Sequence, residues 1–205
     1  MMNEKEMPED LRTVVAFHGH MCPGLAIGYR AAKAAAAKLG LKRDKDEELV
    51  AVVENDACGV DAFQVLLGCS LGKGNLIFRD QGKHAFTVFR RDTGAAVRIV
   101  YTGGSGGDTP EGTALRRKVF AGTATPEEMA MFEENKHQRI RELLTAPLDE
   151  IFAFKQPAFG VPERARVFIS HPCEACGEMT MEPRLRLVDG RKLCLDCSQP
   201  YHRGW

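Results

Sequence analysis

Four cysteines near the end of the sequence have the spacing of a zinc site. They form two C-x-x-C pairs, Cys173 with Cys176 and Cys194 with Cys197, and 17 residues separate the pairs. Zinc is held tetrahedrally at about 2.3 Å from each sulfur, and a tight turn brings the thiolates of residues i and i+3 onto one ion. Two separate redox motifs, or unliganded cysteines, are the alternatives. The spacing favours one structural zinc ion.

A second group of metal-ligand side chains lies near the start of the chain, in the sequence HGHMCPG. His18, His20 and Cys22 place two imidazoles and one thiol within five residues. Imidazole and thiolate together suit a transition metal such as zinc, nickel or iron. Three protein ligands with one open position are typical of a catalytic metal. The alternatives are a nucleophilic Cys22, or histidines in hydrogen-bonded turns around an unreactive cysteine.

Residues of the next segments are candidates to complete this site. Cys58 lies in ENDACGVDAFQ and Cys69 in LGCSLGKGN. Either could fold back as a further metal ligand, and the alternative is that both are ordinary buried cysteines. Asp61 is one of the acids around Cys58, and it is a candidate proton carrier or histidine partner. The candidate catalytic residues are therefore Cys22 and Asp61.

Two predicted helices must position the group of His18, His20 and Cys22 near the start of the chain. One runs from Pro8 to Phe17 and ends at Gly19, and an alanine-rich helix follows from about Leu25 to Leu39. A proline at the first helical position makes Cys22 the N-cap of the second helix. There the helix dipole and the unpaired N–H groups are expected to lower the pKa of its thiol.

Short strands and helices follow, and they predict an α+β fold. Residues 49–54 have the pattern of a buried strand, and residues 61–67 that of a short helix. Residues 75–79 and 84–90 predict a hairpin, with residues 95–102 as a third strand. Because sequential strands are joined by short turns, we expect an antiparallel sheet with helices packed on one face.

The later part of the chain predicts three regions. The last helix of a core domain, residues 1–146, is marked by Thr125 as N-cap. Residues 147–168 contain several prolines and apolar anchors and are predicted to be a linker or arm. Residues 169–205 are predicted to be the zinc-binding module, with residues 165–170 as a strand that leads into it.

Composition limits the class of protein. Lys plus Arg and Asp plus Glu both number 28, so the formal net charge is zero and no basic excess indicates nucleic-acid binding. The N-terminus has no secretory signal, and no apolar run approaches the roughly 20 residues of a membrane helix. We expect a soluble cytoplasmic protein, in which seven cysteines indicate thiolate ligands rather than disulfides.

The segments FHGHMCPGLAIGYR, ENDACGVDAFQVLLGCSLGKGNLIF and GKHAFTVFRR resemble the FmdE family, which is named after one of the subunits of formylmethanofuran dehydrogenase. The resemblance implies an α+β core, an intertwined homodimer and a C-terminal treble-clef zinc finger. The parent complex uses a molybdenum or tungsten pterin carried on its other subunits, and this chain has no sign of a pterin-binding domain. The resemblance also implies a metal- or thiol-bearing cleft made by His18, His20, Cys22 and Cys58, with Cys69 and Asp61 as further candidates.

Three functions are therefore expected, in this order. The first is an accessory or subunit metalloprotein of one-carbon or redox metabolism, related to methanogenesis through its parent family and in contact with redox-enzyme subunits. The second is a stand-alone enzyme that uses Cys22 as nucleophile or metal ligand. The third is a protein-interaction module held together by zinc.

Overall fold

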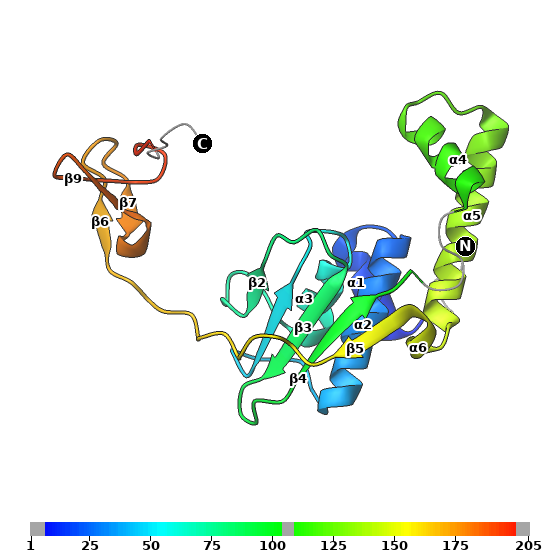
Figure 1. Cartoon of the computed structure of the whole chain (residues 1–205), viewed down its shortest axis with the longest axis horizontal. Coiled ribbons are helices and arrows are strands. Elements are labelled where there is room, and N and C mark those ends of the chain that lie inside the picture. Colours follow the sequence, from blue (N-terminus) through cyan, green and yellow to red (C-terminus); the bar gives the residue numbers. More distant parts are fainter. Residues whose placement is uncertain (1–6, 104–108, 200–205) are drawn as a thin grey trace. The chain divides into compact units, whose positions relative to one another are not determined.

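The computed structural model describes residues 7–103 and 109–199. The chain forms two compact units, Met1–Arg164 and Ala165–Trp205. The larger unit contains a central sheet with helices (Figure 1). The smaller unit is rich in cysteine. None of the helices in the described ranges combines the length and apolar character that a bilayer crossing requires.

A five-stranded sheet with the strand order β2-β1-β3-β4-β5 lies at the centre of the larger unit. Four of its strands pair antiparallel with their neighbours, whereas β2 lies parallel to β1. The sheet is therefore mixed, and the predicted fully antiparallel sheet is corrected at this edge. The strands are β1 (Leu49–Val53), β2 (Leu76–Phe78), β3 (Ala85–Arg90), β4 (Ala96–Tyr101) and β5 (Phe152–Lys155).

The predicted hairpin between residues 75–79 and 84–90 is wrong. Both segments contain strands, but β2 and β3 lie on opposite sides of β1. Helix α3 (Val60–Leu67) carries the chain from β1 to a parallel β2. The chain then passes the end of β1, where the N–H groups of Arg79 and Lys83 donate to carbonyls of residues in or just after β1. Strand β1 thus has a neighbour at each edge, and all five of its residues are buried, as is usual for a central strand.

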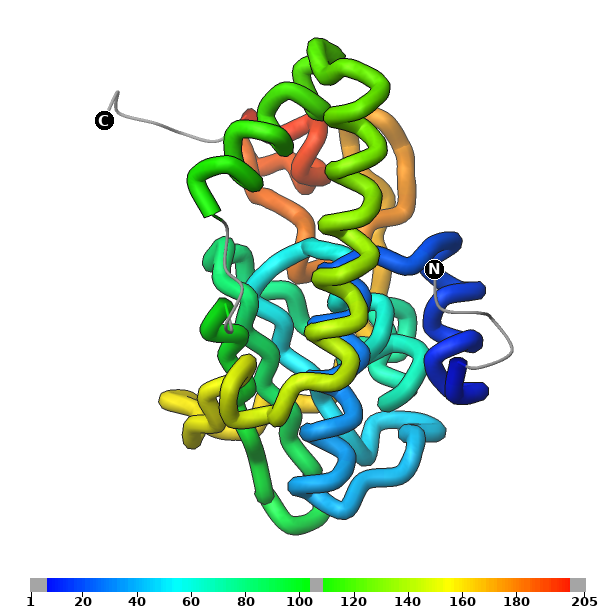
Figure 2. The backbone as a smooth tube through the Cα atoms, turned by 90° about the vertical axis from the view of Figure 1, so that its right-hand side faces the viewer, coloured from blue at the N-terminus to red at the C-terminus, as the bar shows by residue number. Residues whose placement is uncertain are grey.

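Helices cover one face of the sheet, as predicted. The buried alanines of α2 (Pro23–Leu39) allow it to approach the strands closely. The rings of Phe63 and Phe86 stack beneath it with centroids 4.6 Å apart. Helix α5 (Pro126–Thr145) packs along α2 (Figure 2), and α1 (Glu9–His18) packs on α3 and α2.

The segment predicted as a linker contributes to the larger unit. It forms α6 (Leu148–Ile151) and then β5, which pairs with β4. Beyond β5, the ring of Phe159 packs on Phe89 at a centroid distance of 5.6 Å, on the face of the sheet opposite the helices. The apolar anchors of this segment therefore complete the core, and the larger unit extends to Arg164.

A helical hairpin of α4 (Pro110–Phe120) and α5 extends from the larger unit (Figure 1). The predicted start of α5 is confirmed, since Thr125 and Glu128 form a capping box. The Glu128 N–H donates to the Thr125 hydroxyl at 3.2 Å, and the Glu128 carboxylate accepts from the Thr125 N–H at 3.0 Å. Both bonds satisfy N–H groups that have no partner inside the helix.

The smaller unit consists of short strands joined by turns. A hairpin pairs β8 with β9 through Asp189 and Gly190, which both have positive φ angles. The predicted strand over residues 165–170 is corrected, because only Ser170 of that segment lies in a strand. The elements are β6 (Ser170–Pro172), β7 (Met179–Met181), η2 (Glu182–Arg184), β8 (Arg186–Val188) and β9 (Arg191–Leu193).

Candidate metal centres

The four late cysteines come together in the smaller unit. The sulfurs of Cys173, Cys176, Cys194 and Cys197 all lie within 4.8 Å of one another. The Cys176 and Cys194 sulfurs are 4.0 Å apart. Four sulfurs at 2.3 Å from one tetrahedral ion are separated by about 3.8 Å, so a small contraction suffices to hold zinc.

Backbone N–H groups prepare one sulfur of this group for a metal. The Cys194 N–H donates to the Cys173 sulfur at 3.3 Å. Hydrogen bonds from the N–H groups of Cys176, Cys194 and Ala175 lower the pKa of the Cys173 thiol to about 6. Gly177 has a φ of 80° and closes the turn through its N–H bond to the Cys173 carbonyl. The first thiolate is therefore largely formed at neutral pH.

The apolar core of the smaller unit is very small. It consists of Leu193 with the buried cysteines Cys173 and Cys194, and Val188 packs against it. So little apolar area cannot offset the conformational entropy lost by the described residues of this unit, 165–199. Four thiolates on one zinc ion supply the missing free energy of folding, so this is a structural zinc site.

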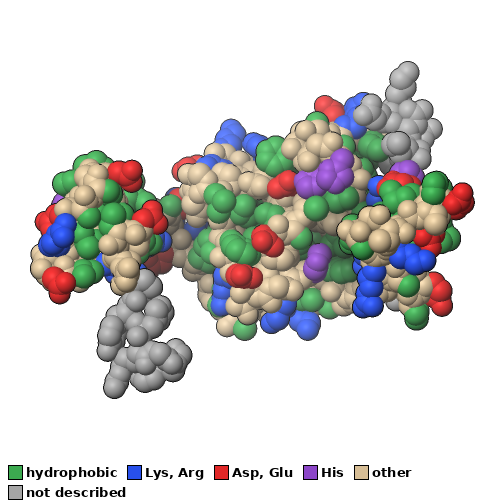
Figure 3. Space-filling view, turned by 90° about the horizontal axis from the view of Figure 1, so that it is seen from above, with side chains coloured by type: hydrophobic (Ala, Val, Ile, Leu, Met, Phe, Trp, Pro, Cys, Tyr) green, Lys and Arg blue, Asp and Glu red, His purple; other side chains and the backbone are tan. Residues whose placement is uncertain are grey.

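His18, His20 and Cys22 form the second group, in the larger unit. One ligand atom from each lies within 4.8 Å of the other two. The Cys22 sulfur is 4.0 Å from Nε2 of His18, and the two imidazole rings have centroids 4.7 Å apart. Figure 3 shows histidine side chains at the surface of this unit with acidic side chains beside them.

The junction of α1 and α2 creates this group. Helix α1 ends at His18, and Gly19 follows in the left-handed conformation with a φ of 92°. The chain then reverses, and Cys22 becomes the N-cap of α2, as predicted, with Pro23 as the first helical residue. The Cys22 sulfur accepts a hydrogen bond of 3.3 Å from the N–H of Leu25.

Asp61 fixes the orientation of His18 from α3. Nδ1 of His18 donates to the Asp61 carboxylate at 2.7 Å, and Gln64 donates to the other oxygen of the same carboxylate at 3.1 Å. With the proton on Nδ1, the lone pair of Nε2 is available on the side of Cys22. Carboxylates commonly orient metal-binding histidines in this way.

Two glycines of α2 allow the loop before α3 to approach this group. A Cβ atom at Gly28 would lie 2.1 Å from the Gly59 carbonyl oxygen, and one at Gly24 would lie 3.3 Å from the Cβ of Cys58. The Cys58 thiol therefore lies beside that of Cys22. Gly24 was expected from the sequence to let the backbone fold tightly here, but Gly28 was missed, although the spacing of four residues between them in GLAIG is a signal of close helix contact.

Cys69 does not join the histidines. Its side chain is fully buried in the main core, and burial raises the pKa of its thiol to about 12. Its nearest charged neighbours are Asp44 and Lys73. The sequence pattern could not place Cys69 and Cys58, because each follows a small residue at one end of α3 and the packing of α3 decides which of them faces the core.

The expected activation of Cys22 is corrected. Burial raises the pKa of the Cys22 thiol above its ordinary value, and the neighbouring Cys58 raises it further. The Leu25 N–H lowers the pKa, but by less than burial raises it. Without a bound cation, Cys22 is therefore a poor nucleophile at neutral pH. A coordinated metal ion removes the proton from a thiol directly, so the geometry favours a ligand role.

A cavity of about 380 Å³ adjoins His18 and Asp61. Polar side chains, among them Gln64, line one part of it. Apolar residues line the rest, including Leu71 and Phe78, which are 70% and 46% exposed. A small molecule in this cavity would contact both the His18–Asp61 pair and an apolar wall.

Comparison with known families agrees with this arrangement. The family described as FmdE, molybdenum formylmethanofuran dehydrogenase operon, matches residues 17–153, which include His18, His20, Cys22, Cys58 and Asp61. This match covers more than half of the 205 residues. The chain belongs to the FmdE family. The prokaryotic dksA/traR C4-type zinc finger matches residues 168–203 of this FmdE-family chain, and that range holds all four late cysteines.

One curated relative and one solved structure are similar to the FmdE-family chain. A probable S-adenosyl-L-methionine-binding protein of Archaeoglobus fulgidus is 34% identical over 196 residues. The match covers 91% of this chain, which spans about half (51%) of that relative. The crystal structure of a tungsten formylmethanofuran dehydrogenase FmdE-like protein from Syntrophus aciditrophicus has a TM-score of 0.61 and 22% identity, over 95% of this chain and 94% of that one. That likeness supports the fold.

Proposed function

We propose that His18, His20 and Cys22 hold one transition-metal ion, and that the chain is a cytoplasmic accessory or subunit metalloprotein of one-carbon or redox metabolism. The observation that carries this proposal is the pair of contacts at His18. Nδ1 is hydrogen-bonded to Asp61 at 2.7 Å, while Nε2 lies 4.0 Å from the Cys22 sulfur. One imidazole is thus oriented by a carboxylate and directed toward a thiol.

The spacing fits an ion between the two atoms. Zinc–nitrogen and zinc–sulfur distances of about 2.0 and 2.3 Å give a nitrogen–sulfur separation of about 3.5 Å at a tetrahedral site. The separation of 4.0 Å between His18 and Cys22 needs only a small side-chain rotation to reach it. Mixed imidazole and thiolate ligands suit zinc, nickel or iron.

Three protein ligands leave one coordination position for a small molecule. A metal ion with such an open position would act as a Lewis acid on the molecule that occupies it. The chain's own residues would then divide the remaining work. Asp61 would hold His18 in one tautomer, the Gln64 amide would hold Asp61, and Leu71 and Phe78 would offer an apolar contact to a bound molecule.

A stand-alone enzyme with Cys22 as nucleophile is less favoured, because burial raises the pKa of that thiol. An interaction module held by zinc accounts for the smaller unit alone. It gives no reason for the carboxylate–histidine pair in the larger unit.

We also propose that the chain forms a homodimer through the α4–α5 hairpin. This hairpin exposes large apolar side chains, namely Phe120 at 77%, Met131 at 51% and Met129 at 41%. Contiguous exposed apolar side chains commonly mark a protein interface. Light scattering at micromolar concentration should give the mass of two chains, and Phe120→Ser should shift it toward one. A monomeric wild-type chain would contradict this proposal.

Cobalt substitution tests the open coordination position. Cobalt(II) bound at the His18 centre should give visible absorption bands, and azide should shift them because it occupies the fourth position. His18→Ala should abolish the azide-sensitive bands, whereas His84→Ala should keep them, because His84 is exposed and lies outside the group. Cobalt at the four-cysteine site should give bands that azide does not shift, so the His18 centre is followed by its azide-sensitive bands alone. A wild-type spectrum without azide-sensitive bands, or azide-sensitive bands that persist in His18→Ala, would refute the open site.

A further inference from the structure

The larger unit has a second and larger cavity, of about 690 Å³, that shares no residue with the metal centre. It is formed by the loop after α2, the start of β1, the end of β3 and the segment around residue 161. Basic side chains outnumber acidic ones on its wall by six to three. The basic residues are Lys42, Arg43, Lys45, Arg90, Arg91 and Arg164.

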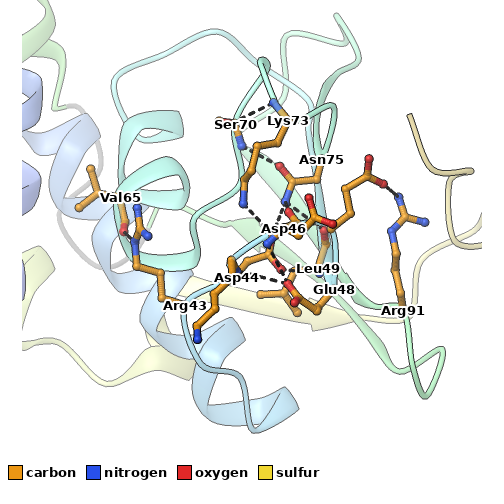
Figure 4. A network of polar contacts seen from close by, with 12 residues as sticks. Arg43, Asp44, Asp46, Glu48, Leu49, Val65, Ser70, Lys73, Asn75 and Arg91 are labelled. Carbon is orange, nitrogen blue, oxygen red and sulfur yellow. Dashed lines mark hydrogen bonds and ion pairs between the residues drawn. The ribbon is translucent and has the colours of Figure 1, made fainter. Parts of the chain in front are cut away.

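The three acidic side chains are already satisfied within the protein. Asp92 accepts two hydrogen bonds of 2.8 Å from Arg90. Asp44 is buried and pairs with Lys73 at 2.9 Å (Figure 4). Glu48 accepts two backbone N–H groups, at 3.1 and 3.2 Å (Figure 4). Arg90 thus neutralises Asp92 and Lys73 neutralises Asp44, whereas Glu48 keeps one negative charge against the five other basic side chains of the cavity.

Several of those cations lack an anionic partner. The side chains of Lys42, Lys45 and Arg164 have no hydrogen bond or ion pair in the described part of the chain. Arg91 differs from these three, because its guanidinium donates to the carbonyls of Pro162 and Glu163 and pairs with Glu47 at 3.6 Å, and only its buried Nε has no hydrogen-bond partner in the described residues. Because the formal charge of the whole chain is zero, this excess of positive charge is local to the cavity.

We propose that this cavity binds a small phosphorylated molecule that carries at least two negative charges. Cations contributed by separate segments require more than one negative group to neutralise them. Guanidinium and ammonium groups together bind phosphate oxygens well, through bidentate hydrogen bonds and point charges respectively. The volume lies within the usual range for small-molecule sites. The proposal does not depend on the metal centre.

Calorimetry with fructose 1,6-bisphosphate at constant ionic strength tests this proposal. The wild-type chain should release or absorb heat in a saturable titration with a stoichiometry of one per chain. The double variant Lys45→Gln/Arg164→Gln should bind at least about 100-fold more weakly, because it removes two charge-assisted hydrogen bonds that contribute about tenfold or more each. Amide resonances of residues 42–45 should shift in the wild-type protein on addition of the probe.

The matched control is Lys155→Gln/Arg117→Gln, which removes one lysine and one arginine that are exposed and lie outside the cavity. It should bind as the wild-type chain does. Tricarballylate, a tricarboxylate, should bind at least about tenfold more weakly than the bisphosphate. No saturable binding to the wild type, equal losses in both double variants, or equal affinity for tricarballylate would each overturn the proposal.

Discussion

At the residue scale, the main feature of the larger unit is that the two nitrogens of the His18 ring have different partners. Asp61 accepts the Nδ1 proton, and Nε2 is left near Cys22. A histidine placed only for packing would not need a carboxylate at 2.7 Å together with a thiol on its other side. The proposed role as an oriented metal ligand accounts for both contacts.

Removing the charge of Asp61 should weaken the centre without disturbing the fold. We expect Asp61→Asn to lower metal affinity at the His18 group by about 10- to 100-fold, because the histidine loses the carboxylate that orients it. Competition with a chromophoric chelator measures this affinity. Asp56→Asn is the matched control, since Asp56 lines the same cavity without a bond to His18. An equal loss in both variants would contradict the orienting role.

The pH dependence of Cys22 alkylation distinguishes a metal-ligand role of this thiol from a role as nucleophile. Because burial raises the pKa of its thiol, the metal-free folded chain should show alkylation of Cys22 that increases only as the pH rises to about 9 and above. Mass spectrometry of the Cys22 peptide after timed alkylation measures this rate. The urea-unfolded chain should react at lower pH. A half-maximal rate below about pH 8 in the folded chain would restore the nucleophile.

Sequence alone predicted the ligand types but not all of their contacts. His18, His20 and Cys22 are close in sequence, so a single turn had to bring them together. Asp61 is 43 residues away from His18, and only the packing of α3 against α1 joins the two. Cys69 was a further candidate beside Cys58, and its place in the core depends on long-range packing that no local pattern encodes.

At the scale of elements, the contact between α2 and the loop before α3 positions the centre. We expect Gly28→Ala to destabilise the chain by about 1–3 kcal/mol, because the new methyl group would overlap the backbone of Gly59. Urea denaturation followed by circular dichroism measures the change. Gly72→Ala is the control, since a Cβ there meets nothing within 4 Å and its φ is not positive. If both variants unfold at the same urea concentration, the close approach has no energetic role.

Helix positions followed from the sequence better than strand pairing did. Proline and capping residues mark the start of α2 and α5, and these signals act within a few residues. The partners of β2 depend instead on which edge of the buried β1 remains available after α3 has crossed the sheet. A turn-like sequence at residues 80–83 therefore suggested a hairpin that the fold does not form.

At the scale of the whole molecule, the two units depend on metal differently. Removal of zinc should unfold the smaller unit and leave the larger unit folded, because only the larger one has an extensive apolar core. Amide resonances recorded before and after chelation would follow each unit separately. Simultaneous loss of all dispersed resonances would contradict this independence.

The zinc site should also have a defined acid limit. The pKa of the Cys173 thiol is lowered to about 6 in the folded unit. The thiolate therefore stabilises the folded unit fully at pH values above the ordinary pKa of a thiol. That contribution is lost as the pH falls through about 6. We therefore expect zinc release from the smaller unit between about pH 6 and pH 4, followed with a fluorescent zinc indicator. Cys176→Ser should release zinc at a higher pH, and an unchanged release curve would contradict the four-thiolate site.

The metal content of the intact chain, purified without chelators, tests the two-centre account most directly. The account predicts two metal ions per chain in the wild type. His18→Ala and Cys22→Ser should each lower this to one and retain the zinc of the smaller unit, whereas Cys176→Ser should retain the ion of the larger unit. A wild-type chain with a single zinc ion, unchanged in His18→Ala and Cys22→Ser, would contradict the proposed centre.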